Sequence, residues 1–248
     1  MLLAEFDARM RAVFRPRETA PGDRAVNGIQ VAMTARPVGR VAFAVDAALE
    51  SIRRAAAWRA DVLFVHHGLF WGDERPLVDT HYLRVKALVE ADMALYAEHL
   101  PLDLHPELGN NAAIADALRL VDRRPFGEYK GTFIGVAGSL PEPRALAELS
   151  RALDFPGMLP FGAERIRTVG IVSGKAPEIG LQAAAQGGDC YVTGEVGHEQ
   201  YHEDLERRID VLFGGHYRTE VFGVRRVAEL AASELGLQTT FVDVATGM

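Results

Sequence analysis

Two stretches far apart in the chain each contain a histidine that is followed four residues later by a carboxylate. His99 precedes Asp103 in the first stretch, and His216 precedes Glu220 in the second. A short apolar run comes before each histidine, so each imidazole would lie near the end of a buried strand. Imidazoles and carboxylates together are ligands that zinc, iron, manganese and cobalt accept in proteins. These residue types and spacings indicate a metal site.

Two adjacent imidazoles add to this set of ligands. His66 and His67 follow the apolar residues 62–65 and precede Gly68. Side chains alternate across a strand, but a glycine lets the chain leave the sheet and turn both rings toward one cavity. An isolated pair of histidines is most often a surface or turn feature. Combined with the two histidine-to-carboxylate spacings, the pair favours metal binding.

The donor set predicts two divalent metal ions per chain, which could be zinc, iron, manganese or cobalt. The candidate ligands include no thiolate, which argues against an iron–sulfur cluster. Two neighbouring dications repel each other and need a bridging anion, and Glu220 is the natural bridging carboxylate. A metal-bound water acidified toward hydroxide would be a hydrolytic nucleophile, and the remaining positive charge would attract an anionic or phosphorylated substrate.

The other polar and aromatic candidates have simpler interpretations. Asn110 and Asn111 precede an alanine-rich segment, which favours a helix N-cap over substrate contact. Phe70 and Trp71 could wall a pocket, although core packing explains them equally well. We assign the remaining histidines to solvent-exposed or supporting roles: His81, His105, His198 and His202.

The elements that would position these residues alternate between strand and helix. An amphipathic helix over 2–14 opens the chain, and the apolar strands between the later helices are typical of an α/β protein with a largely parallel sheet covered on both faces. Strands are predicted over 40–45, 62–66, 93–98, 168–173, 190–194, 209–213 and 239–244. Helices are predicted over 47–58, 80–91, 111–118, 177–186, 197–207 and 219–234. We expect a loop after His99, because of Pro101.

The spacing of these elements indicates an internal duplication. Val41 and Asp61 are separated by the same number of residues as Val169 and Asp189, with no gap between the matching patterns. Chance similarity between two alanine-rich segments is the alternative. We expect a first repeat over 1–120 and a second over 166–248 that together form one compact unit. Residues 121–165 would connect them, with a possible strand over 132–137 and a possible helix over 144–153.

The charge and cysteine content indicate which kinds of partner and which cellular compartment to expect. The formal charge is −7, and scattered arginines give no basic stripe, so nucleic acid is an unlikely partner. The single Cys190 lies in an apolar run, which indicates a buried thiol in a reducing compartment. The first residues show no signal-peptide pattern, and no run approaches the roughly 20 apolar residues that span a bilayer. We therefore expect a cytoplasmic protein with no membrane partner.

Three motifs in this order resemble those of the GTP cyclohydrolase I type 2 homologues, also called the NGG-interacting-factor-three-like family. The similarity extends over nearly the whole chain and includes residues 27–31. The motifs are Val65-His66-His67-Gly68-Leu69-Phe70-Trp71, the segment from His99 to Asn111, and Thr193-Gly194-Glu195-Val196 with Gly215-His216-Tyr217-Arg218-Thr219-Glu220.

This resemblance implies two intertwined, duplicated α/β repeats with mostly parallel or mixed sheets and a dinuclear metal site between them. It implies that His66 and Asp103 hold one ion, that His67 and His216 hold the other, and that Glu220 bridges the two. The family also implies a ring-shaped homohexamer. The extra domain of longer members is absent, because residues 121–165 are too few to form it.

The resemblance points to a hydrolase without naming its substrate. Glu220 and His99 would have the catalytic roles, with His99 at the edge of the site as a proton donor or substrate contact. The family name implies hydrolytic opening of the purine ring of GTP, yet the chain has no Walker-type loop or guanine-reading motif. We expect a small anionic or nucleotide-like substrate. The alternative is a metal-storage, metal-delivery or interaction protein with a structural dinuclear centre, although five or six shared protein ligands leave room for water and so favour catalysis.

Overall fold

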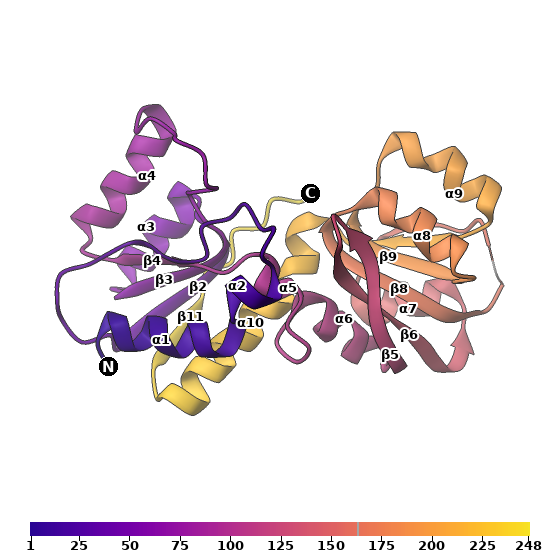
Figure 1. Cartoon of the computed structure of the whole chain (residues 1–248), viewed down its shortest axis with the longest axis horizontal. Coiled ribbons are helices and arrows are strands. Elements are labelled where there is room, and N and C mark those ends of the chain that lie inside the picture. The colour runs from indigo at the N-terminus through magenta and orange to yellow at the C-terminus, as the bar shows by residue number, and fades with distance from the viewer. Residues whose placement is uncertain (163) are drawn as a thin grey trace. The chain divides into compact units, whose positions relative to one another are not determined.

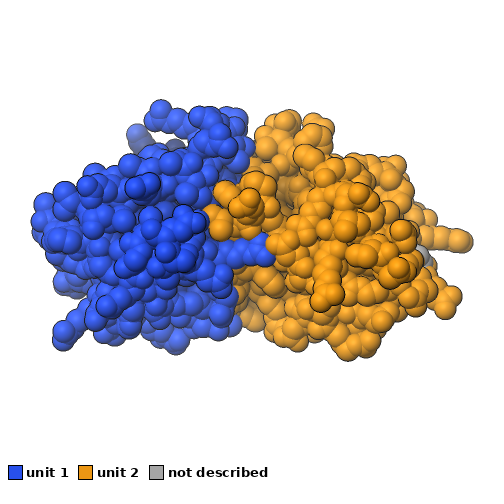
Figure 2. Space-filling view, turned by 90° about the horizontal axis from the view of Figure 1, so that it is seen from below, with its two compact units in different colours: residues 1–102, 223–245 blue, residues 103–222, 246–248 orange. Residues whose placement is uncertain are grey.

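The computed structural model describes residues 1–162 and 164–248, which form two compact units. Unit 1 consists of residues 1–102 and 223–245, and unit 2 consists of residues 103–222 and 246–248 (blue and orange in Figure 2). Each unit is built around one β-sheet. Residue 163, inside the segment expected to connect the repeats, lies outside the described residues. Among those that are described, no helix combines the length and apolarity needed to cross a membrane.

Sheet A, in unit 1, takes its strands from both ends of the chain. Its order is β1-β4-β3-β2-β11, where β1 alone runs antiparallel to its neighbour. The strand β11 pairs with β2 although about 198 residues separate their first residues along the chain. The second repeat therefore completes the sheet of the first, which confirms the intertwined, mixed α/β fold. The strands are β1 (Gly28–Val31), β2 (Arg40–Asp46), β3 (Val62–His67), β4 (Ala94–Ala97) and β11 (Gln238–Phe241).

Alternate residues along the strands of sheet A point to opposite faces, and both faces of the sheet are buried. Small and aliphatic side chains such as Leu63 and Val65 pack with α3 (Leu49–Ala57) and α4 (Asp79–Glu90) on one side (Figure 1). On the other side, Phe64 stacks on Tyr96, with ring centroids 5.6 Å apart. Phe6 of α1 (Leu3–Phe14) forms a T-shaped contact with Tyr96, with ring centroids 5.4 Å apart. A strand buried on both faces explains the continuous apolar runs in the sequence. A short helix, α2 (Pro16–Thr19), follows α1.

Sheet B, in unit 2, has a parallel centre and antiparallel edges. Its order is β5-β6-β8-β9-β10-β7, and β8, β9 and β10 are the parallel strands. Residues 121–165 supply β5, β6 and β7, so this segment forms part of the sheet. The predicted strand over 132–137 lies within the longer β6. The strands are β5 (Val121–Tyr129), β6 (Thr132–Arg144), β7 (Gly157–Leu159), β8 (Ile166–Lys175), β9 (Cys190–Glu195) and β10 (Asp210–Phe213).

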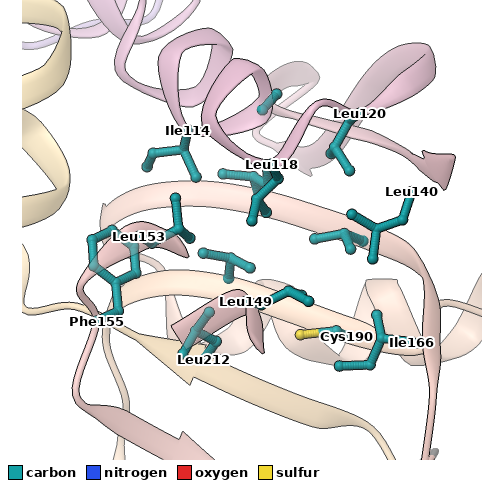
Figure 3. Close-up of a cluster of buried hydrophobic side chains, with 14 of the residues drawn as sticks. Ile114, Leu118, Leu120, Leu140, Leu149, Leu153, Phe155, Ile166, Cys190 and Leu212 are labelled. Carbon is teal, nitrogen blue, oxygen red and sulfur yellow. The ribbon is translucent and has the colours of Figure 1, made fainter. Parts of the chain in front are cut away.

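Helices cover both faces of sheet B. Leucines of α6 (Asn110–Leu118) and α7 (Leu146–Leu153) pack over Cys190 and Leu212 (Figure 3). Cys190 is fully buried, as predicted, and burial raises the pKa of its thiol well above the usual value. Tyr191, next along β9, points to the opposite face with Phe126 and Ala183. The helical segments near that face are η1 (Pro177–Ile179), α8 (Gly180–Ala185), η2 (His198–Gln200) and α9 (Tyr201–Arg207).

Three helix starts differ from the sequence prediction. The loop expected after His99 is instead a short helix, α5 (Leu100–Asp103), because proline at the second helical position lacks only an N–H that would have no partner in the helix. The long helix α10 (His216–Leu235) starts at His216, three residues before the predicted start. Asn110 and Asn111 are the first residues of α6, and Gly109 occupies the cap position, so the N-cap interpretation is wrong.

The same hydrogen-bond pattern opens both repeats. Asp61 Oδ2 accepts hydrogen bonds from the backbone N–H groups of Gly39 and Arg40, at 2.7 and 2.8 Å. Asp189 Oδ2 accepts them from Arg167 and Thr168, both at 2.8 Å. In each repeat the aspartate before the second strand therefore fixes the start of the first strand. This correspondence supports the interpretation of an internal duplication.

Candidate metal centre

Three imidazoles lie together at the carboxyl ends of strands in unit 1. His66 and His67 end β3, and His99 follows β4. Their ring centroids are 4.6 Å apart for His66 and His67, 5.1 Å for His66 and His99, and 5.7 Å for His67 and His99. One nitrogen from each ring lies within 4.8 Å of the other two. The parallel strands of sheet A thus bring these three predicted residues to one edge.

Each of the three rings is oriented by an acceptor oxygen at Nδ1. His66 Nδ1 lies 3.0 Å from the backbone oxygen of Glu98, His67 Nδ1 lies 2.8 Å from Asp46 Oδ1, and His99 Nδ1 lies 2.9 Å from Asp23 Oδ1. Since a carbonyl or carboxylate only accepts, the ring proton belongs on Nδ1 in all three neutral histidines. Nε2 then carries the lone pair. This arrangement is the usual one for histidines that bind a metal ion.

The turn after His67 is held by a glutamine from β1. Gln30 Oε1 accepts hydrogen bonds from the backbone N–H groups of Leu69 and Phe70, at 2.6 and 3.2 Å. A Cβ atom on Gly68 would come within 2.4 Å of the Gln30 amide, so a larger residue there would displace this side chain. Gln30 therefore fixes where the histidine strand leaves the sheet. Sequence reasoning assigned no role to this residue beyond its place in the resemblance over 27–31.

Two aromatic residues after this turn have different positions. The Trp71 ring lies edge-on to His99, with centroids 4.9 Å apart, and 6.2 Å from His67. Phe70 packs against the aliphatic core of unit 1 and against His81 at 5.3 Å. Trp71 therefore borders the histidines, whereas Phe70 belongs to the core. His81 is buried, and burial lowers its pKa, so its predicted exposed or supporting role becomes a packing role.

In unit 2, His216 and Glu220 form one ligand group on the first turn of α10. His216 Nε2 lies 3.1 Å from Glu220 Oε1, and His216 Nδ1 lies 2.6 Å from Glu195 Oε1. Glu220 is buried, and a Cβ atom on Gly174 would lie 2.3 Å from its Oε1. Gly174 has a φ of +66°, so glycine both permits this backbone conformation and leaves room for the carboxylate.

The two carboxylates determine the charge of His216. Burial alone would lower its pKa, but the hydrogen bonds and charges of Glu220 and Glu195 raise the pKa to about 9. The group therefore holds one proton near neutral pH in the absence of a metal ion. A divalent cation could take the place of that proton, because it too would neutralise the carboxylates.

Asp103, at the end of α5, is held by neighbouring polar side chains of unit 2. Its Oδ1 accepts hydrogen bonds from Asn110 Nδ2 at 2.8 Å and from Ser173 Oγ at 3.1 Å. Asn111 donates to the Asp103 backbone oxygen at 3.2 Å and accepts from the Ser173 N–H at 2.8 Å. The two asparagines thus position a candidate ligand. Their adjacency at the start of a mostly apolar helix was the available signal for this role.

Sequence reasoning assigned no role to the carboxylates that orient the histidines. Asp46 and Glu195 each precede the histidine they contact, His67 and His216, by 21 residues. This repeated separation was a usable signal. Asp23 lies 76 residues from His99, and nothing in the local sequence marks that pairing.

The two histidine-to-carboxylate spacings do not arise from equivalent positions. In sheet A the register pairs Val65 with Ala97, and in sheet B it pairs Thr193 with Phe213. Counting onward from these pairs, His216 corresponds to residue 100, one position after His99. The histidine-to-carboxylate pair of the second repeat is therefore shifted by one residue relative to that of the first.

Comparison with known proteins places the chain among proteins of similar length. A family model described as Duf34/NIF3 (NGG1p interacting factor 3) matches residues 1–247. A Treponema pallidum protein named GTP cyclohydrolase 1 type 2 homolog is 40% identical, with 100% of both chains covered. A Halobacterium salinarum protein of the same name is 43% identical, with 98% of each covered. The crystal structure of TTHA1606 from Thermus thermophilus has a TM-score of 0.90 at 35% identity, with both chains fully covered.

Proposed function

Because the chain belongs to the Duf34/NIF3 family, we propose that it is a metal-dependent hydrolase with a dinuclear centre that acts on a small anionic or nucleotide-like substrate. The observation that carries this proposal is the group formed by His66, His67 and His99. Three neighbouring imidazoles share one orientation, with Nδ1 directed to an acceptor and a ligand nitrogen of each within 4.8 Å of the others. Core packing alone does not require that arrangement.

The proposed ligands come from both units. His66 and Asp103 would hold one ion, His67 and His216 the other, and Glu220 would be shared by the two. Support comes from each unit separately, since His66 and His67 have the orientation of metal ligands, and Asp103 and Glu220 are buried carboxylates held by polar neighbours.

The residues fit a divalent ion of the zinc, iron, manganese or cobalt class. The donors are imidazole nitrogens and carboxylate oxygens, which these ions accept, and their supporting hydrogen bonds are in place. When bound, the ions would acidify water and stabilise negative charge on the substrate. The identity and number of ions are part of the proposal.

The chain's own residues would handle the substrate and its protons. His99 lies within reach of the other two imidazoles, and its Nε2 would exchange a proton with the reacting group. Trp71 offers an aromatic ring beside His99, against which a planar substrate could pack. The name of the relatives, GTP cyclohydrolase 1 type 2 homolog, supports GTP as the first compound to test.

The proposed assembly is a homohexameric ring, which follows from the family resemblance. Light scattering of the purified protein checks this part of the proposal. A stable monomer over a wide concentration range would contradict it, and a mass near six times 27.1 kDa would support it.

The decisive experiment combines metal analysis with a substrate screen. Freshly purified protein is expected to contain two divalent ions per chain, and the loaded protein should hydrolyse at least one of three classes, GTP, phosphoesters or cyclic amides. Glu220→Ala should lose both metal and turnover. Asp73→Asn, which alters an exposed carboxylate paired with Arg24, should keep both. If every class remains unhydrolysed while a chelator readily exchanges the metal, a metal-storage or metal-delivery protein replaces the hydrolase.

A further inference from the structure

We propose that Asp23 is a positioning residue that acts through His99. It holds the His99 ring with the proton on Nδ1, so that Nε2 faces the His66 and His67 group as a proton acceptor. The inference deepens the proposed hydrolase and rests on it for the fate of the accepted proton. It also changes the role of His99 from the proton donor expected from the sequence to a general base.

The Asp23 carboxylate is fixed by hydrogen bonds at both oxygens. Oδ1 accepts the backbone N–H of Ala25 at 3.0 Å and lies 2.9 Å from His99 Nδ1. Oδ2 accepts Asn27 Nδ2 at 3.0 Å and the backbone N–H of Leu100 at 3.1 Å. The side chain is only 3% exposed. With donors on every side, the carboxylate cannot turn away from the imidazole.

His99 is held on its other sides as well. Its backbone N–H donates to Asn27 Oδ1 at 2.8 Å, so residues 23–27 fix both the ring and the backbone. The Trp71 ring lies 4.9 Å away in an edge-on arrangement. These contacts leave the ring one orientation, in which Nε2 is the nitrogen directed away from Asp23.

The carboxylate distinguishes His99 from His66. A backbone oxygen orients His66, whereas Asp23 is ionic and forms a charge-assisted hydrogen bond, which is roughly twice as strong as a neutral one. A base needs its accepting nitrogen kept free of a proton, and the wrong tautomer would block it. His67 also has a carboxylate partner, Asp46, but that side chain is 35% exposed, whereas Asp23 is 3% exposed. The more deeply buried of the two carboxylates therefore orients His99, the imidazole without a proposed metal.

The hydrogen bonds around Asp23 make Asp23→Asn a selective test. If the new amide NH₂ replaced Oδ2, it would face two donors, Asn27 Nδ2 and the Leu100 N–H. If it replaced Oδ1, it would face only the Ala25 N–H and His99. The second choice is favoured, and it makes Asn the donor to His99 Nδ1. The ring proton should then move to Nε2.

The tautomer is read by long-range ¹H–¹⁵N NMR of the metal-free full-length protein, at a pH where imidazoles are neutral. The His99 signals are assigned by their loss in His99→Gln. Wild type should show a lone pair on Nε2, and Asp23→Asn should show it on Nδ1, whereas Asp73→Asn should match wild type. A protonated Nε2 in wild type would overturn the proposal even if Asp23→Asn fails to fold. So would an unchanged tautomer in a folded Asp23→Asn.

Activity provides the second measurement. On a substrate found in the screen, Asp23→Asn should lower kcat by about 10²–10⁴-fold, the range of general base catalysis, with KM and metal content unchanged. Loss of metal in this variant would make His99 a ligand and overturn its role as a base. If no substrate is hydrolysed, the hydrolase proposal fails while the NMR result still decides whether Asp23 sets the tautomer.

Discussion

The two repeats are alike where their strands begin and different where their strands end. At the beginning, Asp61 and Asp189 accept hydrogen bonds from the backbone in the same way. At the end, the positions of His66 and His67 correspond, by counting from these aspartates, to Gly194 and Glu195. The residues where the strands begin thus stabilise the fold in both repeats, and the residues where the strands end are those that could do chemistry.

The difference shows how one scaffold supports two kinds of ligand group. His67 is oriented by Asp46, whereas Glu195, at the corresponding place in the second repeat, itself orients His216. The position corresponding to Asp46 is Gly174, which makes room for Glu220. Candidate ligand and supporting residue have therefore exchanged positions between the repeats.

The largest expected effect comes from His67→Ala, which removes a proposed ligand. We expect metal affinity to fall by more than about 100-fold, since loss of supporting residues alone costs about 10–100-fold. Elemental analysis after dialysis against a weak chelator measures the change. A variant that keeps two ions per chain would contradict the proposed difference between the repeats, because His67 would then not be a metal ligand.

Glu195→Gln tests the corresponding position in the second repeat. The amide can still meet His216 but has lost the charge, so metal affinity should fall by about 10–100-fold, less than in His67→Ala. Competition with a chromogenic chelator measures it. Lys175→Met is the control, since Lys175 is exposed and only approaches Glu195 at 3.9 Å. An affinity loss equal to that of His67→Ala would indicate that Glu195 is itself a metal ligand.

The matching aspartates should affect stability without affecting metal binding. Asp61→Ala and Asp189→Ala each remove a charged acceptor from two backbone N–H groups and leave them to water, which should cost about 2–3 kcal/mol of unfolding free energy. Urea denaturation measures this, and metal content should stay at the wild-type level. Asp73→Ala should change stability by less than about 0.5 kcal/mol. A change confined to one of the two variants would weaken the claim that the strand beginnings are equivalent.

The smallest effect concerns a buried carboxylate that has no counterpart in the first repeat. In the second repeat, the Asp204 backbone oxygen accepts the N–H of Ile209 at 3.1 Å. In the first repeat, the Leu88 backbone oxygen accepts the N–H of Met93 at the same distance. Asp204 therefore corresponds to Leu88, a buried core residue. Burial, followed by the charge of Glu203, raises the pKa of Asp204 to about 6.

Because the folded-state pKa is raised, the protonated form stabilises the fold at low pH. That contribution is fully present below about pH 4 and is lost as the pH rises through about 6. Asp204→Asn should therefore be more stable than wild type at pH 7 by on the order of 1–2 kcal/mol, and the gap should close by pH 4. Thermal denaturation at both pH values measures it. A constant difference would show that the carboxylate titrates normally.

Strand and helix positions were largely predictable because apolar runs and their spacing report burial directly. The exceptions were places where polar side chains decide the local structure. β5 has mostly exposed residues and no apolar alternation, so its pairing with β6 was not visible. The start of α10 follows Gly215, whose φ of +91° lets the chain turn from β10 into the helix three residues before the predicted start.

The candidate ligands were visible in the sequence, but most residues that orient them were not. Histidines at strand ends stand out because few side chains bind metals. Asp23 contacts His99 from 76 residues away along the chain, and Asn110 contacts Asp103 across the 7 residues that join α5 to α6. Neither residue differs in type from an ordinary turn or helix-start residue, so its role required the three-dimensional structure.

The pairing of β11 with β2 sets an order for biosynthesis. As the ribosome makes the chain, residues 40–46 emerge long before residues 238–241, and until then one side of β2 lacks its neighbour. An unpaired apolar strand edge is prone to pair with other chains. The nascent amino-terminal half therefore passes through a period of exposure to aggregation, and a fragment that stops before β11 would retain that exposed edge permanently.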